Sequence, residues 1–96
     1  MNNDAITRIL RRAITDAGLY INHVHHASSL RVEFTTCPPL WWSYAQCDEA
    51  TSKILDAPIG ESGTISDHFS TKHNRAHDYW RFRLESYHLD PALCRG

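Results

Sequence analysis

Residues 18–35, GLYINHVHHASSLRVEFT, contain the change of pattern that decides the fold. Two runs, 19–25 and 30–35, are rich in β-branched and aromatic residues, which favour extended backbone. The second run alternates strictly between apolar and polar side chains, and the apolar ones are Leu30, Val32 and Phe34. The short segment 27–29 joins the two runs, so the pattern predicts a β-hairpin.

The first run of this hairpin alternates less regularly. If Leu19 and Ile21 face the core, strict alternation sends Val24 toward solvent. An extra residue in the strand, or a partly buried histidine, would resolve the conflict. We therefore expect a bulge or a buried histidine between residues 21 and 25.

Upstream of the hairpin, residues 4–17 carry apolar side chains at steps of three and four, which is typical of an amphipathic helix. Asn3 or Asp4 can cap the start of this helix, and Gly18 can adopt the left-handed conformation that ends it. The predicted apolar face consists of Ile6, Ile9, Leu10, Ala13, Ile14 and Ala17.

Downstream of the hairpin, residues 37–42 include two adjacent prolines, which lack backbone donors and exclude a central strand. This segment is predicted to be a loop. Ser43 is followed three residues later by Gln46, the pattern of a capping box, and Pro58 marks a stop. A second helix is therefore predicted, with one face formed by Tyr44, Cys47, Thr51, Ile54 and Leu55.

The C-terminal third is the part that the pattern constrains least. Residues 60–63 are predicted to form a turn, and residues 79–85 fit either a strand or a longer helical stripe. The strand is favoured because aromatic and alternating residues dominate its centre, with Trp80, Phe82 and Leu84 on one face. Residues 64–69 are then expected to form its partner strand, and residues 70–78 a polar connection.

These elements predict the α+β fold class, with an N-terminal helix, an antiparallel sheet built from hairpins and a second helix packed on one face. A chain of 96 residues is long enough for one hydrophobic core and too short for two. We therefore expect residues 1–96 to form a single small domain.

Charge and cysteine content limit the class of partner and the compartment. The formal net charge is only −1, which indicates neither a general nucleic-acid binder nor an acidic mimic, although residues 37–67 alone carry one basic and five acidic side chains. No stretch approaches the roughly 20 apolar residues of a membrane span. Three cysteines cannot all pair within one chain, so a reduced cytoplasmic setting is expected; they are Cys37, Cys47 and Cys94.

Catalysis is not indicated by any motif in the chain. The sequence lacks phosphate-binding glycine loops, a nucleophile elbow and a paired-cysteine zinc knuckle, so no metal and no cofactor is predicted. The alternative is a small ribonuclease-like or metal-dependent hydrolase that uses the histidines and arginines of residues 68–88. Arg83 and His88 have an Arg-x4-His spacing, which is too short a pattern to define a family.

Protein recognition is the function that the residue types favour. Tryptophan and tyrosine dominate binding energy at many interfaces, and a proline-stiffened loop would present them preorganised. At least one of two adjacent tryptophans is expected to be exposed, with an acidic rim on the following helix. The predicted partner-binding residues are Trp41, Trp42, Tyr44, Asp48 and Glu49.

The sequence thus predicts a small non-enzymatic module that binds another protein. An inhibitor or regulator of a larger assembly is one such class, and phage or mobile-element proteins that act against host defence are an example. A second binding mode is contact with nucleic acid through Arg81 and Arg83, which alternate with aromatic residues on a predicted strand.

Overall fold

The computed structural model describes residues 4–76, 79–87 and 89–90. All pairings within its four-stranded sheet are antiparallel, and the strand order is β1-β2-β4-β3. This architecture confirms the predicted α+β class. Along the chain the elements are α1 (Asp4–Asp16), β1 (Tyr20–Ser28), β2 (Arg31–Cys37), α2 (Tyr44–Leu55), a 3-10 turn (Ile65–Asp67), β3 (Phe69–Ala76) and β4 (Tyr79–Ser86).

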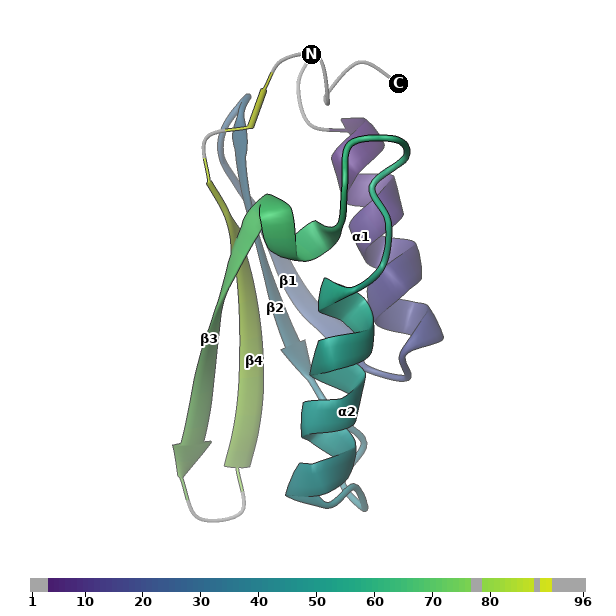
Figure 1. Ribbon diagram of the computed structural model, residues 1–96. Coiled ribbons are helices and arrows are strands. Elements are labelled where there is room, and N and C mark those ends of the chain that lie inside the picture. The colour runs from purple at the N-terminus through teal and green to yellow at the C-terminus, as the bar shows by residue number, and fades with distance from the viewer. Residues whose placement is uncertain (1–3, 77–78, 88, 91–96) are drawn as a thin grey trace.

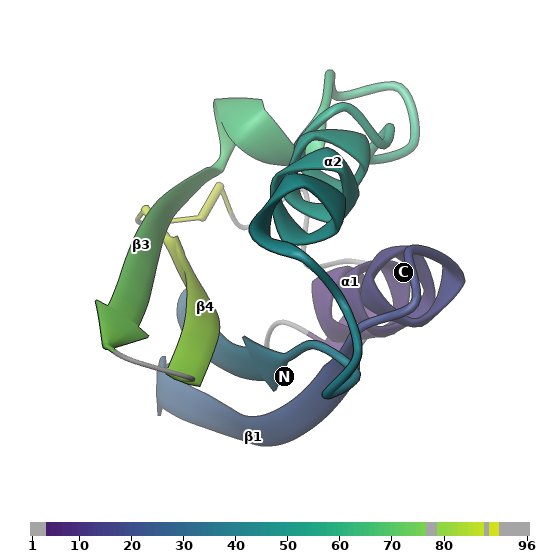
Figure 2. The ribbon, with the colours of Figure 1, turned by 90° about the horizontal axis from the view of Figure 1, so that it is seen from below.

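Both helices lie on the same side of the sheet, which curves around them (Figure 1; Figure 2). The element order consists of two successive units, each a helix followed by a β-hairpin, and the second strands of the two units pair in the middle of the sheet. An approximate two-fold axis between the two units would pair their equivalent strands, β2 and β4, in this antiparallel way. Among the described residues, no helix covers the other side of the sheet, where the side chains of Lys72 and Arg83 are exposed.

The first hairpin contains the irregularity that the sequence predicts. Ile21 pairs with Thr36 and His23 with Thr35, so one residue of β1 is left without a partner at this point. Because of this bulge, Ile21 and Val24 both lie opposite residues that are buried in the core. A second register shift lies between His26 and Ser28.

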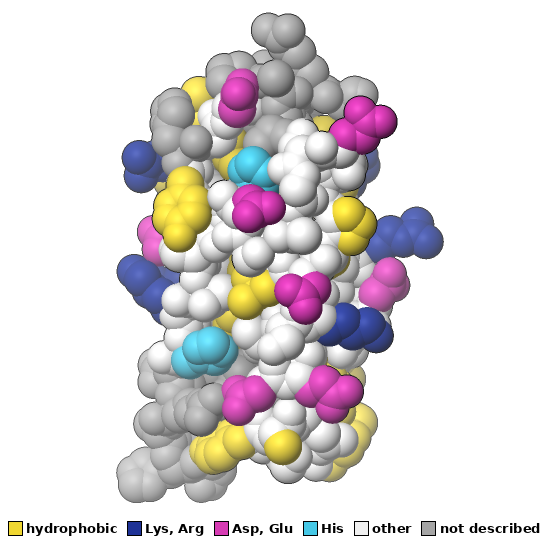
Figure 3. Space-filling model, in the orientation of Figure 1, with side chains coloured by type: hydrophobic (Ala, Val, Ile, Leu, Met, Phe, Trp, Pro, Cys, Tyr) yellow, Lys and Arg dark blue, Asp and Glu magenta, His cyan; other side chains and the backbone are white. Residues whose placement is uncertain are grey.

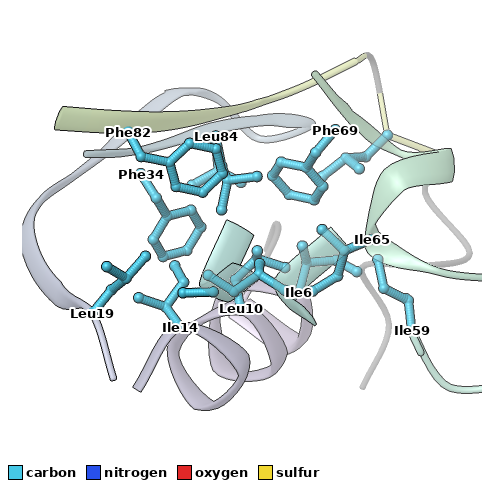
Figure 4. Close-up of a cluster of buried hydrophobic side chains, with 14 of the residues drawn as sticks. Ile6, Leu10, Ile14, Leu19, Phe34, Ile59, Ile65, Phe69, Phe82 and Leu84 are labelled. Atoms are coloured by element: carbon cyan, nitrogen blue, oxygen red, sulfur yellow. The ribbon is translucent and has the colours of Figure 1, made fainter. Parts of the chain in front are cut away.

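The hydrophobic core lies between α1, α2 and the concave side of the sheet. In Figure 4, Leu10 and Ile14 of α1 point toward Phe34, whose neighbours on the same sheet face are Phe82 and Leu84. The apolar residues that recur at every third or fourth position of α1 therefore pack against those that recur at every second position of β2 and β4. Burial of each such side chain stabilises the fold by roughly 1.5–3 kcal/mol before chain entropy is counted.

Polar groups that enter this core are hydrogen-bonded, and two of them connect the central strands. The Thr36 hydroxyl donates to the Phe82 carbonyl oxygen at 2.9 Å, and the Val32 N–H donates to the Ser86 hydroxyl at 2.9 Å. Because an unpaired buried polar group costs about 1–3 kcal/mol, these bonds help to fix the β2–β4 register.

The predicted partner strand at residues 64–69 is wrong. Residues 65–67 form the 3-10 turn, and the strand that pairs with β4 begins at Phe69 and continues through residues predicted to be a connection. The Asp67 carboxylate accepts the Thr64 N–H at 2.8 Å, which holds this segment in a turn. The favoured strand at residues 79–85 is confirmed as β4, although the Trp80 side chain lies outside the described part of the structure.

The two helices are short, with 13 residues in α1 and 12 in α2. A membrane-spanning helix needs about 20 predominantly apolar residues. Within the described residues, neither the length nor the hydrophobicity of any helix would allow it to cross a bilayer.

Candidate partner-binding site

The loop between β2 and α2 turns at residues 39–42. The Trp42 N–H donates to the Pro39 carbonyl oxygen at 3.2 Å, which closes a four-residue turn with Leu40 and Trp41 at its two corner positions. Pro39 is buried and Trp42 is half-buried, so both ends of the turn are anchored in the protein. The side chains of the two corner residues project into solvent.

The result is an exposed apolar surface beside the start of α2. Leu40 is 99% exposed, Trp41 is 77% exposed and Tyr44 is 45% exposed. We call these three residues the aromatic corner. Figure 3 shows hydrophobic side chains gathered at the end of the molecule where α2 begins, with acidic side chains next to them. The other large exposed hydrophobic residues in the described part, Tyr20 and Tyr87, are tyrosines on the strands or next to them.

The capping box predicted from Ser43 and Gln46 is confirmed and holds the aromatic corner in place. The Gln46 N–H donates to the Ser43 hydroxyl at 3.3 Å, and the Ser43 N–H donates to the Gln46 side-chain oxygen at 2.8 Å. These reciprocal bonds fix the backbone direction at the point where the loop enters α2. The aromatic corner is therefore presented on a defined scaffold.

Trp42 faces the opposite way from its neighbour and packs against the core and the end of α1. Gly18, which follows α1, has a φ of +92°, and a Cβ built on it would lie 2.9 Å from the Trp42 ring. Glycine is therefore required there twice, for the left-handed backbone and for the close approach of the indole. The structure thus separates the tryptophan pair into one anchoring ring and one exposed ring.

A shallow hollow of about 210 Å³ lies between the end of α1 and α2. Pockets that hold small molecules usually have volumes of about 300–1,000 Å³, so the size of this hollow suits a single side chain better than a cofactor. It is lined by Ala17, Trp42, Gln46, Glu49, Ala50 and Lys53.

The acidic rim that the sequence predicts is formed by side chains on α2. Asp48 and Glu49 are both exposed, within the segment 37–67 whose five acidic residues outnumber its single basic one. Glu49 also lines the hollow. Apolar and acidic groups therefore adjoin on this end of the molecule, and the role of these residues in binding stays a prediction.

The arginines proposed for nucleic-acid contact lie on β4, away from this surface. Arg83 is on the solvent-facing side of the sheet and forms an ion pair with Glu33 at 3.2 Å, while Lys72 pairs with Glu85 at 3.3 Å on the same side. Two acidic residues thus alternate with the basic ones on this face. The Arg81 side chain lies outside the described part of the structure.

The described histidines lie in separate parts of the fold, namely on β1, on β3 and directly after the 3-10 turn. His23 and His25 stack at 6.2 Å between ring centroids on β1, His73 stacks on Phe82 at 5.1 Å, and His68 lies with Nε2 2.8 Å from the Ser62 carbonyl oxygen. No group of three potential metal ligands occurs among the residues that the structure describes. His77 and His88 lie outside them, so the proposed cluster at residues 68–88 is described only in part.

Two of the three cysteines are described, and neither forms a disulfide bond among the described residues. The Cys37 thiol donates to the Asn22 side-chain oxygen at 3.0 Å, and Cys47 is buried on α2. Cys94 lies outside the described residues.

Sequence reasoning did not assign to the partner-binding surface three residues that shape it. Leu40 is the most exposed large hydrophobic side chain in the described part, and Ala17 and Gly18 contribute the wall and the space beside Trp42. Leu40 could have been found from its position directly after two prolines, where a turn corner is favoured. The contact of Gly18 with Trp42 spans 24 positions of the chain and leaves no local signal.

Comparison with known proteins identifies no relative. No family model matches the chain, and neither the curated proteins nor the solved structures contain a significant match.

Proposed function

We propose that this protein is a small non-enzymatic module that binds another protein through the aromatic corner. The observation that carries the proposal is the exposure of Leu40 and Trp41 at the tip of a turn whose two ends are anchored. Polar residues would serve equally well at these two corner positions for folding alone. Large apolar side chains there therefore support a role outside the fold.

Burial of these side chains against a partner would be favourable for two reasons. Removal of apolar surface from water contributes about 25 cal/mol per Å², and tryptophan has one of the largest such surfaces. The capped start of α2 already fixes the backbone around the corner, so less conformational entropy is lost on binding. The exposed carboxylates of Asp48 and Glu49 would add a polar rim that favours one orientation of the partner.

The finer part of the proposal concerns the kind of partner. A domain of 96 residues without a catalytic motif suits an inhibitor or regulator that docks onto a larger assembly. Phage and mobile-element proteins that block host defence systems are one class of this kind. Size and the missing catalytic motifs are the support for this part.

The test is affinity capture from a lysate of the cells that naturally produce the protein, with bound proteins quantified by mass spectrometry. Wild type is compared with Leu40→Ser and Trp41→Ala, and Tyr87→Ala serves as the control because Tyr87 is 55% exposed and follows β4 at the opposite end of the sheet (Figure 1). We expect the two corner variants to lose about 30-fold or more in affinity for the captured partner, as at interface hot spots.

The control variant should capture the same partner at the wild-type yield. The proposal is wrong if Trp41→Ala and Leu40→Ser capture every specific partner as efficiently as wild type does.

A further inference from the structure

The hollow beside the aromatic corner has a chemistry of its own. One wall is the half-buried indole of Trp42, another is α2 with Glu49 at its rim, and Ala17 closes the side next to α1. Small residues at 17 and 50 leave the space open. A side chain that enters this hollow would contact an aromatic face and a carboxylate together.

Each of these groups favours a cation. An indole face attracts a positive charge through its quadrupole, and a carboxylate at the rim attracts it directly. Ala17 directly follows the last residue of α1, where helix carbonyl groups carry partial negative charge. The Gly18 and Leu19 N–H groups satisfy the carbonyl oxygens of Thr15 and Ile14.

Lys53 also lines the hollow, and its positive charge repels a cation. It lies one helical turn beyond Glu49, and among the described residues neither side chain takes part in an ion pair. The Lys53 ammonium is exposed and has a long flexible stem, so it can remain in water while the hollow is filled. Its charge should weaken, without preventing, the binding of a cation beside Glu49.

We propose that the hollow receives an arginine side chain of the protein that docks on the aromatic corner, an inference that rests on the proposed function. A guanidinium is planar, so it can stack on Trp42 and donate two hydrogen bonds to the Glu49 carboxylate. A lysine ammonium lacks this fork geometry. The exposed carboxylates of Asp48 and Glu49 make the first turns of α2 complementary to a basic partner.

The first test needs no identified partner. The ¹⁵N-labelled full chain is titrated with the blocked peptide acetyl-Gly-Arg-Gly-amide, and in parallel with the same peptide containing citrulline, which keeps the shape and loses the charge. We expect saturable shifts of the Trp42 indole N–H and the Ala50 amide with arginine at millimolar concentration, at least about 10-fold weaker with citrulline.

The matched variants are Glu49→Gln and Glu61→Gln, which remove the same charge from two exposed positions, one lining the hollow and one in the turn 60–63. Arginine binding should be lost in Glu49→Gln and unchanged in Glu61→Gln. Lys53→Gln should strengthen it by about 2-fold or more, because a repulsive charge is removed. Equal shifts with citrulline, or no saturable shift of Trp42 and Ala50 with arginine, would overturn the proposal.

The same variants separate this inference from the proposed function in affinity capture. If Trp41→Ala loses the partner and Glu49→Gln binds it as wild type does, the proposed docking surface is supported and the proposed arginine site is wrong. If Trp41→Ala and Leu40→Ser both keep the partner, the proposed function itself is wrong. Stronger capture by Glu49→Gln together with weaker capture by Lys53→Gln would indicate an acidic partner group and would also overturn the arginine site.

Discussion

The two connections that flank α2 reverse the chain in different ways. After α2, residues 56–64 form a turn with several backbone hydrogen bonds, in which Ile59 donates to the Gly63 carbonyl oxygen and Ser62 donates to that of Ile59, both at 2.8 Å. This turn buries its large apolar residue, Ile59, and exposes polar side chains. Before α2, the turn at residues 39–42 exposes its large apolar residues instead.

The difference shows that exposure of Leu40 and Trp41 is not a consequence of poor folding. Both connections are anchored by buried residues, and each leads into an element with a capping box. The backbone is therefore held in a defined conformation in both. In the connection after α2 the side chains serve the interior. In the connection before α2, the corner side chains contribute little to the interior, which leaves them available for a partner.

The strongest test of this comparison removes a large apolar side chain from each connection. Ile59→Ala should lower the free energy of unfolding by about 2–4 kcal/mol, because Ile59 is only 2% exposed and its loss leaves a cavity. Leu40→Ala, at 99% exposure, should change it by less than about 0.5 kcal/mol. Urea denaturation monitored by circular dichroism measures both values, and similar losses in the two variants would contradict the comparison.

The next largest effect concerns the backbone of the connection after α2. Gly63 has a φ of +95°, and a Cβ there would overlap the Asp67 carboxylate, so Gly63→Ala should cost about 2–3 kcal/mol. Gly60 has a φ of +52° and open space around it, so Gly60→Ala should cost only about 1 kcal/mol. Thermal unfolding of both variants tests this ranking, which a greater loss in Gly60→Ala would reverse.

A smaller effect is expected where the connection before α2 enters the helix. Ser43→Ala removes the cap from the Gln46 N–H and should cost about 1 kcal/mol. Ser52→Ala, an exposed serine inside the same helix, is the control and should be neutral or slightly stabilising. Chemical denaturation distinguishes them, and equal stability of the two variants would mean that the capping box does not hold the aromatic corner.

The smallest expected effect is a dependence of stability on acid. The pKa of Asp67 is lowered from its ordinary value of 3.8, first because its carboxylate accepts the Thr64 N–H and further because of the Thr64 hydroxyl and His68. The folded state therefore favours the ionised form. Stabilisation is fully present above about pH 4 and is lost as pH falls through the lowered pKa.

Asp67→Asn retains an oxygen acceptor for Thr64 and removes the charge, so it isolates this effect. We expect wild type to lose more in melting temperature than the variant between about pH 5 and about pH 2.5. Identical losses in the two proteins would show that the Asp67 charge does not stabilise this turn.

Much of the fold could be predicted because local patterns and tertiary packing agree. The three- and four-residue spacing in α1, the alternation in β2 and the Ser43–Gln46 box each indicate the structure that forms. The bulge in β1 was predictable because a strict alternation would have exposed Val24. At these positions, the local preference and the position of the core require the same conformation.

The partner of β4 could not be predicted for the opposite reason. The sequence predicts that residues 64–69 pair with β4, but the hydrogen bond from the Thr64 N–H to the Asp67 carboxylate forms a turn before a strand can begin. The true strand β3 lies at the sheet edge and is mostly polar, so its sequence has little hydrophobic periodicity. A long-range pairing with β4, and not a local pattern, determines its conformation.

The site was predictable in type and not in detail. The sequence indicates that at least one of the two tryptophans is exposed. Which one it is depends on the residue at which the turn starts, and this is fixed by the hydrogen bond from the Trp42 N–H to the Pro39 carbonyl oxygen. The hollow depends on the close approach of Gly18 and Trp42, which lie in two different connections of the chain. Such a contact exists only after α1 and α2 have packed.

The pairing of β2 with β4 also has a consequence for how the molecule is made. Each hairpin joins residues that are near each other along the chain, whereas Glu33 lies opposite Glu85 in the central ladder. Contacts between such distant positions slow folding, since a long loop must close before they form. During synthesis on the ribosome, Phe34 therefore cannot contact its β4 neighbours until residue 84 has emerged. The core between β2 and β4 would then form late.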